Sequence, residues 1–396
     1  MKLGWIDFSE KDRKRALEVI QNLTEQGAVD EIGIGVVRDA FSDYFFPGTS
    51  TVQTRAKYFL LSPYIIRDVC RKTRGTSVRQ VLDEINRQEK EFAAEMKNAL
   101  SESSGLIGYR VLPGGWVARK PYDIYWNGLR TFGILKQNVS ISDIIRYTLE
   151  QKSRVESTIK GKAMEDEEEN TGDDTDAGAR AKISFWNLPE AKGWENNHSI
   201  GLTAEEADFL EERMKQSCKG KLLEIILSNR IDVREIGYFD LLCEKVKDIV
   251  DDDLRNMLGL AKDFSRFTYC ARTLYNLFLL GEEKVHEQWS QVEAEPEKFA
   301  SVDLDDVFYQ LRLDSNPKLK KFLIDLKASV LAKDWESCRT VLVEQEKRIK
   351  GASRAKLLTK DKYQNWIGGG YLDYRYGATR RLITDIYDAQ DAEPED

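Results

Sequence analysis

The stretch "FPGTSTVQTRAKYFLLSPYIIRDV", residues 46–69, joins two unlike halves. In the second half, apolar side chains recur at near-helical spacing, which predicts a buried helix from about Thr54 to Lys72. The first half places hydroxyls, an amide and a guanidinium on a turn that contains a proline and a glycine. The free N–H groups and positive dipole end of a helix favour a phosphate or polar ligand there, and a helix cap with solvated neighbours is the alternative. The binding candidates in and just after this turn are Gly48, Thr49, Ser50, Thr51, Gln53, Thr54, Arg55 and Lys57.

Outward from this segment, amphipathic patterns predict one helix after another, and strand-like alternation is scarce. Two helix starts carry clear capping signals: Ser77 before the helix 78–101, and the capping box from Thr203 to Glu206. We therefore expect a mainly α, helical multi-domain fold, compatible with winged-helix or helix-turn-helix-like elements and a small β component. Further helices are predicted at 9–26, 34–45, 143–152, 219–229, 238–250, 252–260, 263–280, 282–293, 303–312, 317–331 and 334–349.

The charge of the chain is unevenly distributed. Its net charge is −8, yet residues 1–163 hold 26 Lys/Arg against 20 Asp/Glu, and the stretch from Lys347 to Arg381 holds ten Lys/Arg against two Asp. Acidic residues concentrate elsewhere, above all in "EDEEENTGDDTD" at 165–176. Local potential governs binding more than total charge does, so both basic regions are candidates for contact with DNA.

Composition divides the chain into four parts. Residues 1–152 are predicted to form an N-terminal helical domain that contacts DNA. Residues 153–183 are predicted to be an acidic flexible linker, because hydrophobicity is low and charge is high there. A second helical domain is predicted over 184–350, and an aromatic and basic C-terminal segment with an acidic tail over 351–396.

Composition also argues against several classes of site. The five cysteines are scattered singly, which indicates a reducing cytoplasm and argues against a disulfide framework or a zinc ribbon. Because the only histidines are His198 and His286, histidine-based metal sites and Ser-His-Asp triads are nearly excluded. No apolar run is long enough for a membrane span, no secretory signal is recognised, and no phosphate-binding or metalloprotease motif occurs. Any catalysis must then rely on carboxylates, hydroxyls, amides, Lys or Arg.

Two carboxylates precede the opening segment on one predicted helical face. Asp39 and Asp43 are four residues apart, next to Arg38, which is itself a candidate for binding substrate or DNA. Like charges at this spacing repel by about 0.2–0.5 kcal/mol unless a cation pairs with them. The pair therefore suits a general base or a site that stabilises a cation, and a solvated acidic face is the alternative.

Aromatic and basic residues alternate in two places, and both are candidate DNA contacts. Aromatic faces stack on bases, and Arg and Lys neutralise phosphates. Packing of the rings into a core, or into an aromatic-rich hairpin or loop, is the alternative in each place. The candidates are Tyr125, Trp126 and Arg130 in the first, and Trp366, Tyr374, Arg375, Arg380 and Arg381 in the second.

Three stretches carry a family resemblance: "LGWIDFSEKDRKRALEVI", "DEIGIGVVRDAFSDYFFPGTSTVQTRAKYFLLSPYI" and "YWNGLRTFGI". They closely resemble an uncharacterised bacterial family of about this length, found among phage-defence genes, and the resemblance covers nearly the whole chain. It extends to anti-phage DNA glycosylases that remove glucosylated hydroxymethylcytosine from viral DNA. The order of elements is also similar to bacterial winged-helix DNA glycosylases with a Gln-apolar-Gln/Asp motif. Thr51-Val52-Gln53 lacks the first Gln of that motif, so its catalytic roles do not transfer directly.

The resemblance implies a cytoplasmic anti-phage enzyme that flips a modified base out of DNA and excises it, leaving an abasic site, without metal, histidine or cofactor. A carboxylate or amide would stabilise an oxocarbenium-like sugar and position water. Asp39 is the first choice for the catalytic carboxylate, Asp43 is the second, and Gln53 would position water. Two rivals remain: a DNA-binding defence subunit without catalysis, and a scaffold that docks other defence proteins.

Overall fold

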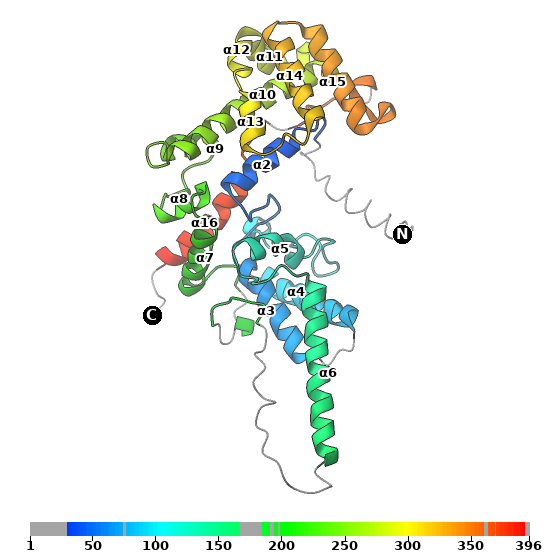
Figure 1. The fold of residues 1–396 in the computed structure, drawn as a ribbon, viewed down its shortest axis with the longest axis vertical. Helices are drawn as coiled ribbons and strands as arrows, with labels where there is room; N and C mark the ends of the chain where they lie inside the picture. The colour runs from blue at the N-terminus through cyan, green and yellow to red at the C-terminus, as the bar shows by residue number, and fades with distance from the viewer. Residues whose placement is uncertain are drawn as a thin grey trace. The chain divides into compact units, whose positions relative to one another are not determined.

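The part of the chain that the structure describes is mainly helical, as its sequence predicts (Figure 1). The computed structural model describes residues 30–73, 77–165, 184–190, 194–196, 199–359, 363–368 and 370–392. Within these ranges, β pairing consists of an isolated antiparallel bridge between Leu135 and Trp186. The predicted helix 9–26, the predicted linker from 166 onward and His198 lie outside the described residues. None of the helices described is long and apolar enough to cross a membrane.

Two compact units divide the structure, and each draws on separate parts of the sequence. Unit 1 consists of Met1–Tyr44 and Cys243–Tyr374, and unit 2 of Phe45–Leu242 and Arg375–Asp396. The four parts predicted from composition are contiguous in sequence, whereas these units are not. Each unit therefore packs together segments that the composition assigns to different parts of the chain.

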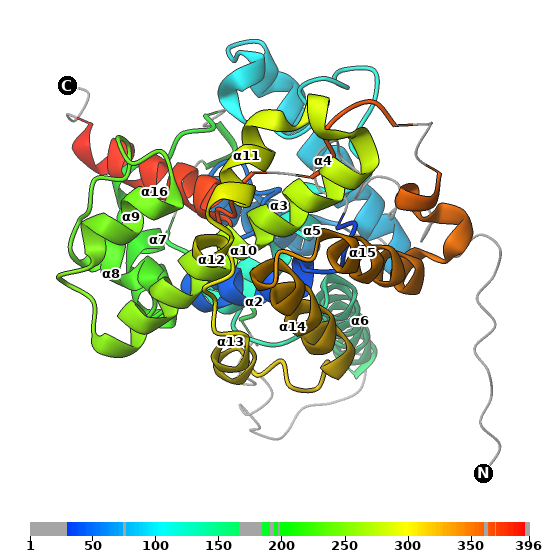
Figure 2. The same cartoon turned by 90° about the horizontal axis from the view of Figure 1, so that it is seen from above.

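In unit 1, the long helix α10 packs against α11, α12, α13 and α15, and α14 lies beside α15 (Figures 1 and 2). Phe41 on α2 packs its ring against Phe264 of α10 and against Tyr374, with ring centroids 5.9 and 5.3 Å away. The helices are α2 (Gly35–Phe45, whose last residue belongs to unit 2), α10 (Asp252–Leu280), α11 (His286–Ala294), α12 (Pro296–Phe299), α13 (Leu304–Gln310), α14 (Pro317–Leu331) and α15 (Trp335–Lys350).

Unit 2 is built around α3, which is buried along most of its length and packs against α4, α5 and α6. Both predicted caps are confirmed: Ser77 Oγ accepts from Gln80 N at 3.3 Å, and Thr203 and Glu206 form a capping box. Helix α16 packs against α7, which also contacts α8. The helices are α3 (Tyr58–Lys72), α4 (Val78–Lys97), α5 (Pro121–Thr131), α6 (Ile141–Glu165), α7 (Ala204–Ser217), α8 (Leu222–Ser228) and α16 (Tyr376–Asp391), and α9 (Phe239–Val246) runs from unit 2 into unit 1.

Two predicted helix boundaries are wrong within continuous helices. The predicted helices 252–260 and 263–280 are the single helix α10, because no glycine or proline interrupts the chain between them and Ala261 is buried on the same face as its neighbours. Helix α6 continues to Glu165, beyond its predicted end at Lys152, since the polar residues that follow Lys152 include no helix breaker before Gly161.

Two other boundaries depend on distant residues. Helix α3 begins at Tyr58 rather than at Thr54, because the N–H groups of residues 54–56 bond to the side chains of Tyr125 and Asp385. For the aromatic C-terminal segment, an aromatic-rich hairpin or loop is the alternative to a DNA contact, and from Tyr376 onward the segment is the helix α16. Its apolar residues recur at helical spacing once the glycine-rich stretch has ended.

Candidate active site

Residues 47–54, the polar turn before α3, are held in place by hydrogen bonds from the turn's own side chains. Gln53 is buried; its Nε2 donates to Gly48 O at 3.2 Å, and its Oε1 accepts from Ser50 N at 3.0 Å. Thr49 Oγ1 donates to Phe46 O at 2.7 Å. Gly48 has a φ of +79°, a left-handed conformation that favours glycine. The amide of Gln53 and the hydroxyl of Thr49 therefore act within the turn.

The two cations that follow the turn are paired with carboxylates. Arg55 Nε donates to both oxygens of Asp385 at 2.9 Å. Lys57 Nζ bonds both oxygens of Glu206 at 2.8 and 2.6 Å, and both of these side chains are buried. The Tyr125 hydroxyl accepts from Arg55 N at 3.0 Å and donates to Arg55 O at 2.8 Å. These contacts join α16, α7 and α5 to the start of α3, which explains the density of polar groups there.

Three C-terminal arginines also bond to backbone carbonyls inside unit 2. Arg375 Nη1 donates to Thr49 O at 3.2 Å, and Arg381 Nη2 donates to Gln53 O at 3.4 Å. Arg380 Nη2 donates at 3.1 Å to a carbonyl in the loop before α9. The structure thus brings together the polar turn and the C-terminal arginines, two groups that the sequence separates by more than 300 residues.

The remaining aromatic and basic candidates are divided between the two units. In unit 2, the half-buried Trp126 donates its Nε1 to a backbone carbonyl at 3.3 Å, and Arg130 is exposed. In unit 1, Tyr374 is buried and donates its hydroxyl to a carbonyl of α10 at 2.6 Å, while Trp366 is half-buried. These residues do not form one contiguous site within either unit.

The two acidic candidates lie on α2 in unit 1, whereas the polar turn belongs to unit 2. The side chain of Asp39 is 48% exposed and accepts from Arg38 Nε at 3.0 Å. Asp43 is exposed one turn later, and Thr51 is the exposed member of the polar turn. The structure places these carboxylates at the surface, and their catalytic role stays a prediction.

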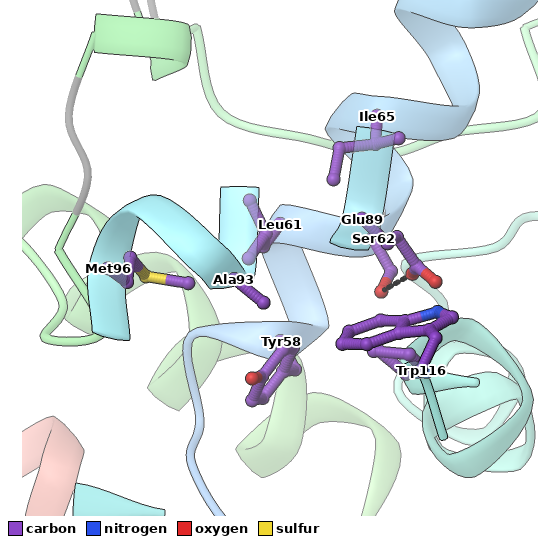
Figure 3. Close-up of a pocket in the computed structure, with 9 residues that line it drawn as sticks. Tyr58, Leu61, Ser62, Ile65, Glu89, Ala93, Met96 and Trp116 are labelled. Atoms are coloured by element: carbon purple, nitrogen blue, oxygen red, sulfur yellow. Dashed lines mark hydrogen bonds between the residues drawn. The ribbon is translucent and has the colours of Figure 1, made fainter. Parts of the chain in front are cut away.

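A small pocket in unit 2 encloses a carboxyl group that the sequence analysis does not single out. It lies between α3, α4 and the loop that precedes α5, and its free space is about that of one water molecule. Figure 3 shows Glu89 of α4 and Ser62 of α3 bonded to each other beside the ring of Trp116. The lining residues are Tyr58, Leu61, Ser62, Ile65, Glu89, Ala93, Met96, Trp116 and Pro121.

Burial keeps the Glu89 carboxyl protonated. The side chain is 4% exposed, and its removal from water raises the pKa of Glu89 to about 8. Oε1 accepts from Ser62 Oγ at 2.8 Å and from Tyr122 N at 3.2 Å. Since these two bonds occupy the lone pairs of Oε1, the proton resides on Oε2. At pH 7, Glu89 is therefore a neutral acid with one O–H donor.

Two polar atoms of this pocket have no hydrogen-bond partner in the part of the chain that the structure describes: Glu89 Oε2 and Trp116 Nε1. Most buried polar groups are satisfied, and leaving one unsatisfied costs about 1–3 kcal/mol. The ring of Trp116 fits only because Gly108 lacks a side chain, since a Cβ there would lie 2.6 Å from it. A buried acid with an unsatisfied oxygen, facing a small pocket, is typical of acid–base sites.

The periodicity of α4 contains a signal for this site. Val81, Ile85, Phe92 and Met96 form its buried face, and Glu89 follows Ile85 at i+4 on the same face. Glutamate is almost never fully buried unless it is paired. A single acid on an otherwise apolar stripe is therefore the feature by which sequence inspection can find Glu89.

We expect the raised pKa of Glu89 to make the protein less stable as pH rises. Below its ordinary pKa of 4.5 the group is protonated in both the folded and unfolded chain, so it imposes no penalty. Between that value and about 8 only the unfolded chain releases the proton, and the free energy of unfolding falls by about 3 kcal/mol from pH 5 to 8 through this group. Urea denaturation across this range measures the slope.

The Glu89→Gln variant is the control for this pH dependence, because glutamine mimics the protonated acid without titrating. It should lose this part of the slope and be more stable than the original chain at pH 8. An unchanged slope in the variant would show that Glu89 is not the group responsible.

The pocket lies within the part of the chain that matches a family of known sequences. Residues 1–162 match a family of unknown function (DUF6361), and this range contains α2, the polar turn and every residue that lines the pocket. No curated protein and no solved structure matches the chain. Among the described residues, no group of three or more His, Cys, Asp or Glu side chains is arranged to hold a metal ion.

Proposed function

We propose that this protein is an anti-phage DNA glycosylase that hydrolyses the N-glycosidic bond of a modified, glucosylated cytosine, with Glu89 as its general acid. The observation that carries the proposal is the buried, protonated Glu89 whose Oε2 has no partner among the described residues. The family resemblance of the N-terminal stretches supplies the substrate. Enzymes that cleave glycosidic bonds use such an acid, raised in pKa by an apolar pocket, to protonate the leaving group.

The chemistry balances with water as the only co-reactant. Glu89 Oε2 donates its proton to the leaving base as the bond from C1′ to the base nitrogen breaks, and the bonding electrons leave with the base. Water then adds to the oxocarbenium carbon, and its proton returns to the Glu89 carboxylate. The products are the free base and an abasic site, and Ser62 keeps the carboxyl oriented through its bond to Oε1.

Two cations that follow Trp116 on the loop before α5 support binding of DNA. Arg119 is exposed and Lys120 is half-buried on the loop that carries Trp116, and Lys120 Nζ lies 6.0 Å from the centre of the Trp116 ring. Phosphates on either side of a flipped nucleotide require cations at such a position. Arg55, Lys57 and the C-terminal arginines contribute less, because they bond to partners inside unit 2.

Base release tests the proposal directly. The purified protein is incubated with unmodified, hydroxymethylated and glucosylated duplex DNA in the presence of EDTA, and free base is measured by mass spectrometry and abasic sites by alkali cleavage. We expect release from glucosylated DNA alone. Absence of release from all three, with salt-sensitive binding retained, would instead favour a non-catalytic DNA-binding subunit; absence of binding as well would favour a scaffold for other defence proteins.

A further inference from the structure

The pocket that holds Glu89 is too small, as it stands, for any nucleobase. Its free space is about that of one water molecule. Trp116 differs from the other lining residues in one respect: the others belong to α3, α4 or the first turn of α5, and Trp116 lies on the loop between α4 and α5. Helices therefore hold the backbone of the rest of the pocket wall, and Trp116 is the lining residue whose backbone lies on a loop.

The loop has conformational freedom next to Trp116. Gly114 and Gly115 immediately precede it, and a Cβ added at Gly114 would meet no atom within 4 Å. Neither glycine has a positive φ, so the backbone does not require glycine there. A Cβ at Gly115 would lie 3.3 Å from the carbonyl oxygen of Val111, so Gly114 alone has neither a packing nor a conformational need for glycine. Glycine at such a position gives the chain conformational freedom two residues before Trp116.

The indole is also poorly matched to the polar groups around it. Trp116 is half-buried, but its Nε1 is enclosed. An enclosed indole N–H usually donates, yet Trp116 Nε1 has no acceptor within the described structure. Glu89 Oε2–H, which lines the same pocket, is a donor as well, so the pocket holds two donors and neither has an acceptor in the described structure. A flat ring with an acceptor at its edge would satisfy Glu89, and the indole has none.

We propose that Trp116 occupies the position of the substrate ring, and that the pocket binds a planar nitrogen heterocycle of pyrimidine class whose edge acceptor takes the hydrogen bond of Glu89 Oε2. Trp116 swings out with its loop when the ring enters. This inference rests on the proposed function and names the substrate class of that same site. The pyrimidine ring itself, without the glucosyl substituent of the proposed substrate, is smaller than indole and presents ring-nitrogen and carbonyl acceptors, so the ring fits the space that Trp116 leaves.

A matched pair of free ligands tests this assignment without DNA. Indole and benzimidazole have nearly the same shape, but benzimidazole has an acceptor nitrogen in place of a ring carbon. We expect the Trp116→Gly variant at pH 6 to bind benzimidazole at least about 10-fold more tightly than indole, because only benzimidazole can accept from Glu89. Titration calorimetry measures the affinities of both ligands, and the same method then measures the affinity of free cytosine.

The same comparison at pH 9 supplies an internal control. Glu89 is then mostly a carboxylate and can only accept, so the preference should shift toward the N–H of indole. The Trp126→Gly variant, which removes a tryptophan whose Nε1 already bonds to a carbonyl, should bind neither ligand. Should Trp116→Gly fail to fold, Trp116→Leu keeps an apolar side chain over the pocket and gives the same comparison.

Folded variants that bind neither ligand, or that bind both equally at pH 6 and pH 9, would overturn the assignment of the ring site. These outcomes are distinguishable from failure of the proposed function. Binding of benzimidazole without base release from DNA would leave a heterocycle site in a protein that is not a glycosylase. Base release without ligand preference would leave a glycosylase whose substrate ring lies elsewhere.

Discussion

Replacing Glu89 by glutamine is expected to lower base release from glucosylated DNA by about 10²–10⁴-fold, the usual contribution of a general acid. Glutamine keeps the shape of the side chain, and its carbonyl oxygen can accept the bonds from Ser62 and Tyr122 that Glu89 Oε1 accepts now. It cannot transfer a proton to a leaving base. Because the neutral amide also avoids the penalty of a buried acid, the variant should be at least as stable as the original chain at pH 7–8.

Loss of activity together with unchanged or increased stability separates a catalytic acid from a structural one. The matched control is Glu91→Gln on the same helix, which removes an exposed carboxylate paired with Arg87 and should change neither quantity by much. Single-turnover base release and urea denaturation measure the two effects. Full activity in Glu89→Gln would exclude it as the acid.

The base-release assay also compares the candidate carboxylates of α2, Asp39 and Asp43, with Glu89 of α4. If Asp39→Asn or Asp43→Asn abolishes base release while Glu89→Gln does not, the catalytic carboxylate lies on α2, as the sequence predicts, and the buried pocket has another role. Because both aspartates are accessible to solvent, their variants should fold normally, and loss of activity there would reflect chemistry or DNA contact.

Replacing Lys57 by methionine is expected to reduce the free energy of unfolding by about 3–5 kcal/mol. Its Nζ bonds both oxygens of Glu206, and the two side chains are only 6% and 8% exposed. Methionine fills the volume of the lysine stem but leaves the carboxylate of Glu206 buried, with the backbone N–H of Thr203 as its one remaining donor among the described residues. The penalty comes from that uncompensated charge.

Three variants make this measurement specific. Lys57→Met combined with Glu206→Gln should recover much of the loss, since no buried charge then remains. Lys215→Met breaks the i,i+4 pair with Glu211 on α7, where the lysine side chain is 39% exposed, and should cost less than about 1 kcal/mol. A loss in Lys57→Met as small as that in Lys215→Met would mean that the Lys57–Glu206 pair is solvated in the folded protein.

The stability of this contact bears on function through the polar turn. Arg55 and Lys57 are predicted ligand contacts, and in the structure they pair with Asp385 and Glu206. These bonds connect α3, the helix that carries Ser62, to α7 and α16. A variant that weakens them would therefore disturb the pocket indirectly, and any loss of activity in Lys57→Met must be compared with its loss of stability before a DNA contact is inferred.

Local sequence determined the helices of this protein. A hydroxyl or acidic cap, an apolar residue every third or fourth position and the absence of Gly and Pro suffice to form a helix, and all three are visible within a short window. Ser77 and Thr203 cap their helices as predicted, and α14 begins and ends where its pattern does. Glu89 shares the helical spacing of the buried residues of α4, although the sequence analysis does not single it out.

Tertiary structure alone decided what the polar residues do. Arg55 looks like a phosphate ligand until Asp385, 330 residues away, is found against it. Glu89 becomes an acid with a raised pKa only when α3, the start of α5 and the loop with Trp116 remove its carboxyl from water. The reason is physical: helix formation depends on neighbours in sequence, whereas the charge state and partners of a side chain depend on the dielectric and the donors that distant segments bring to it.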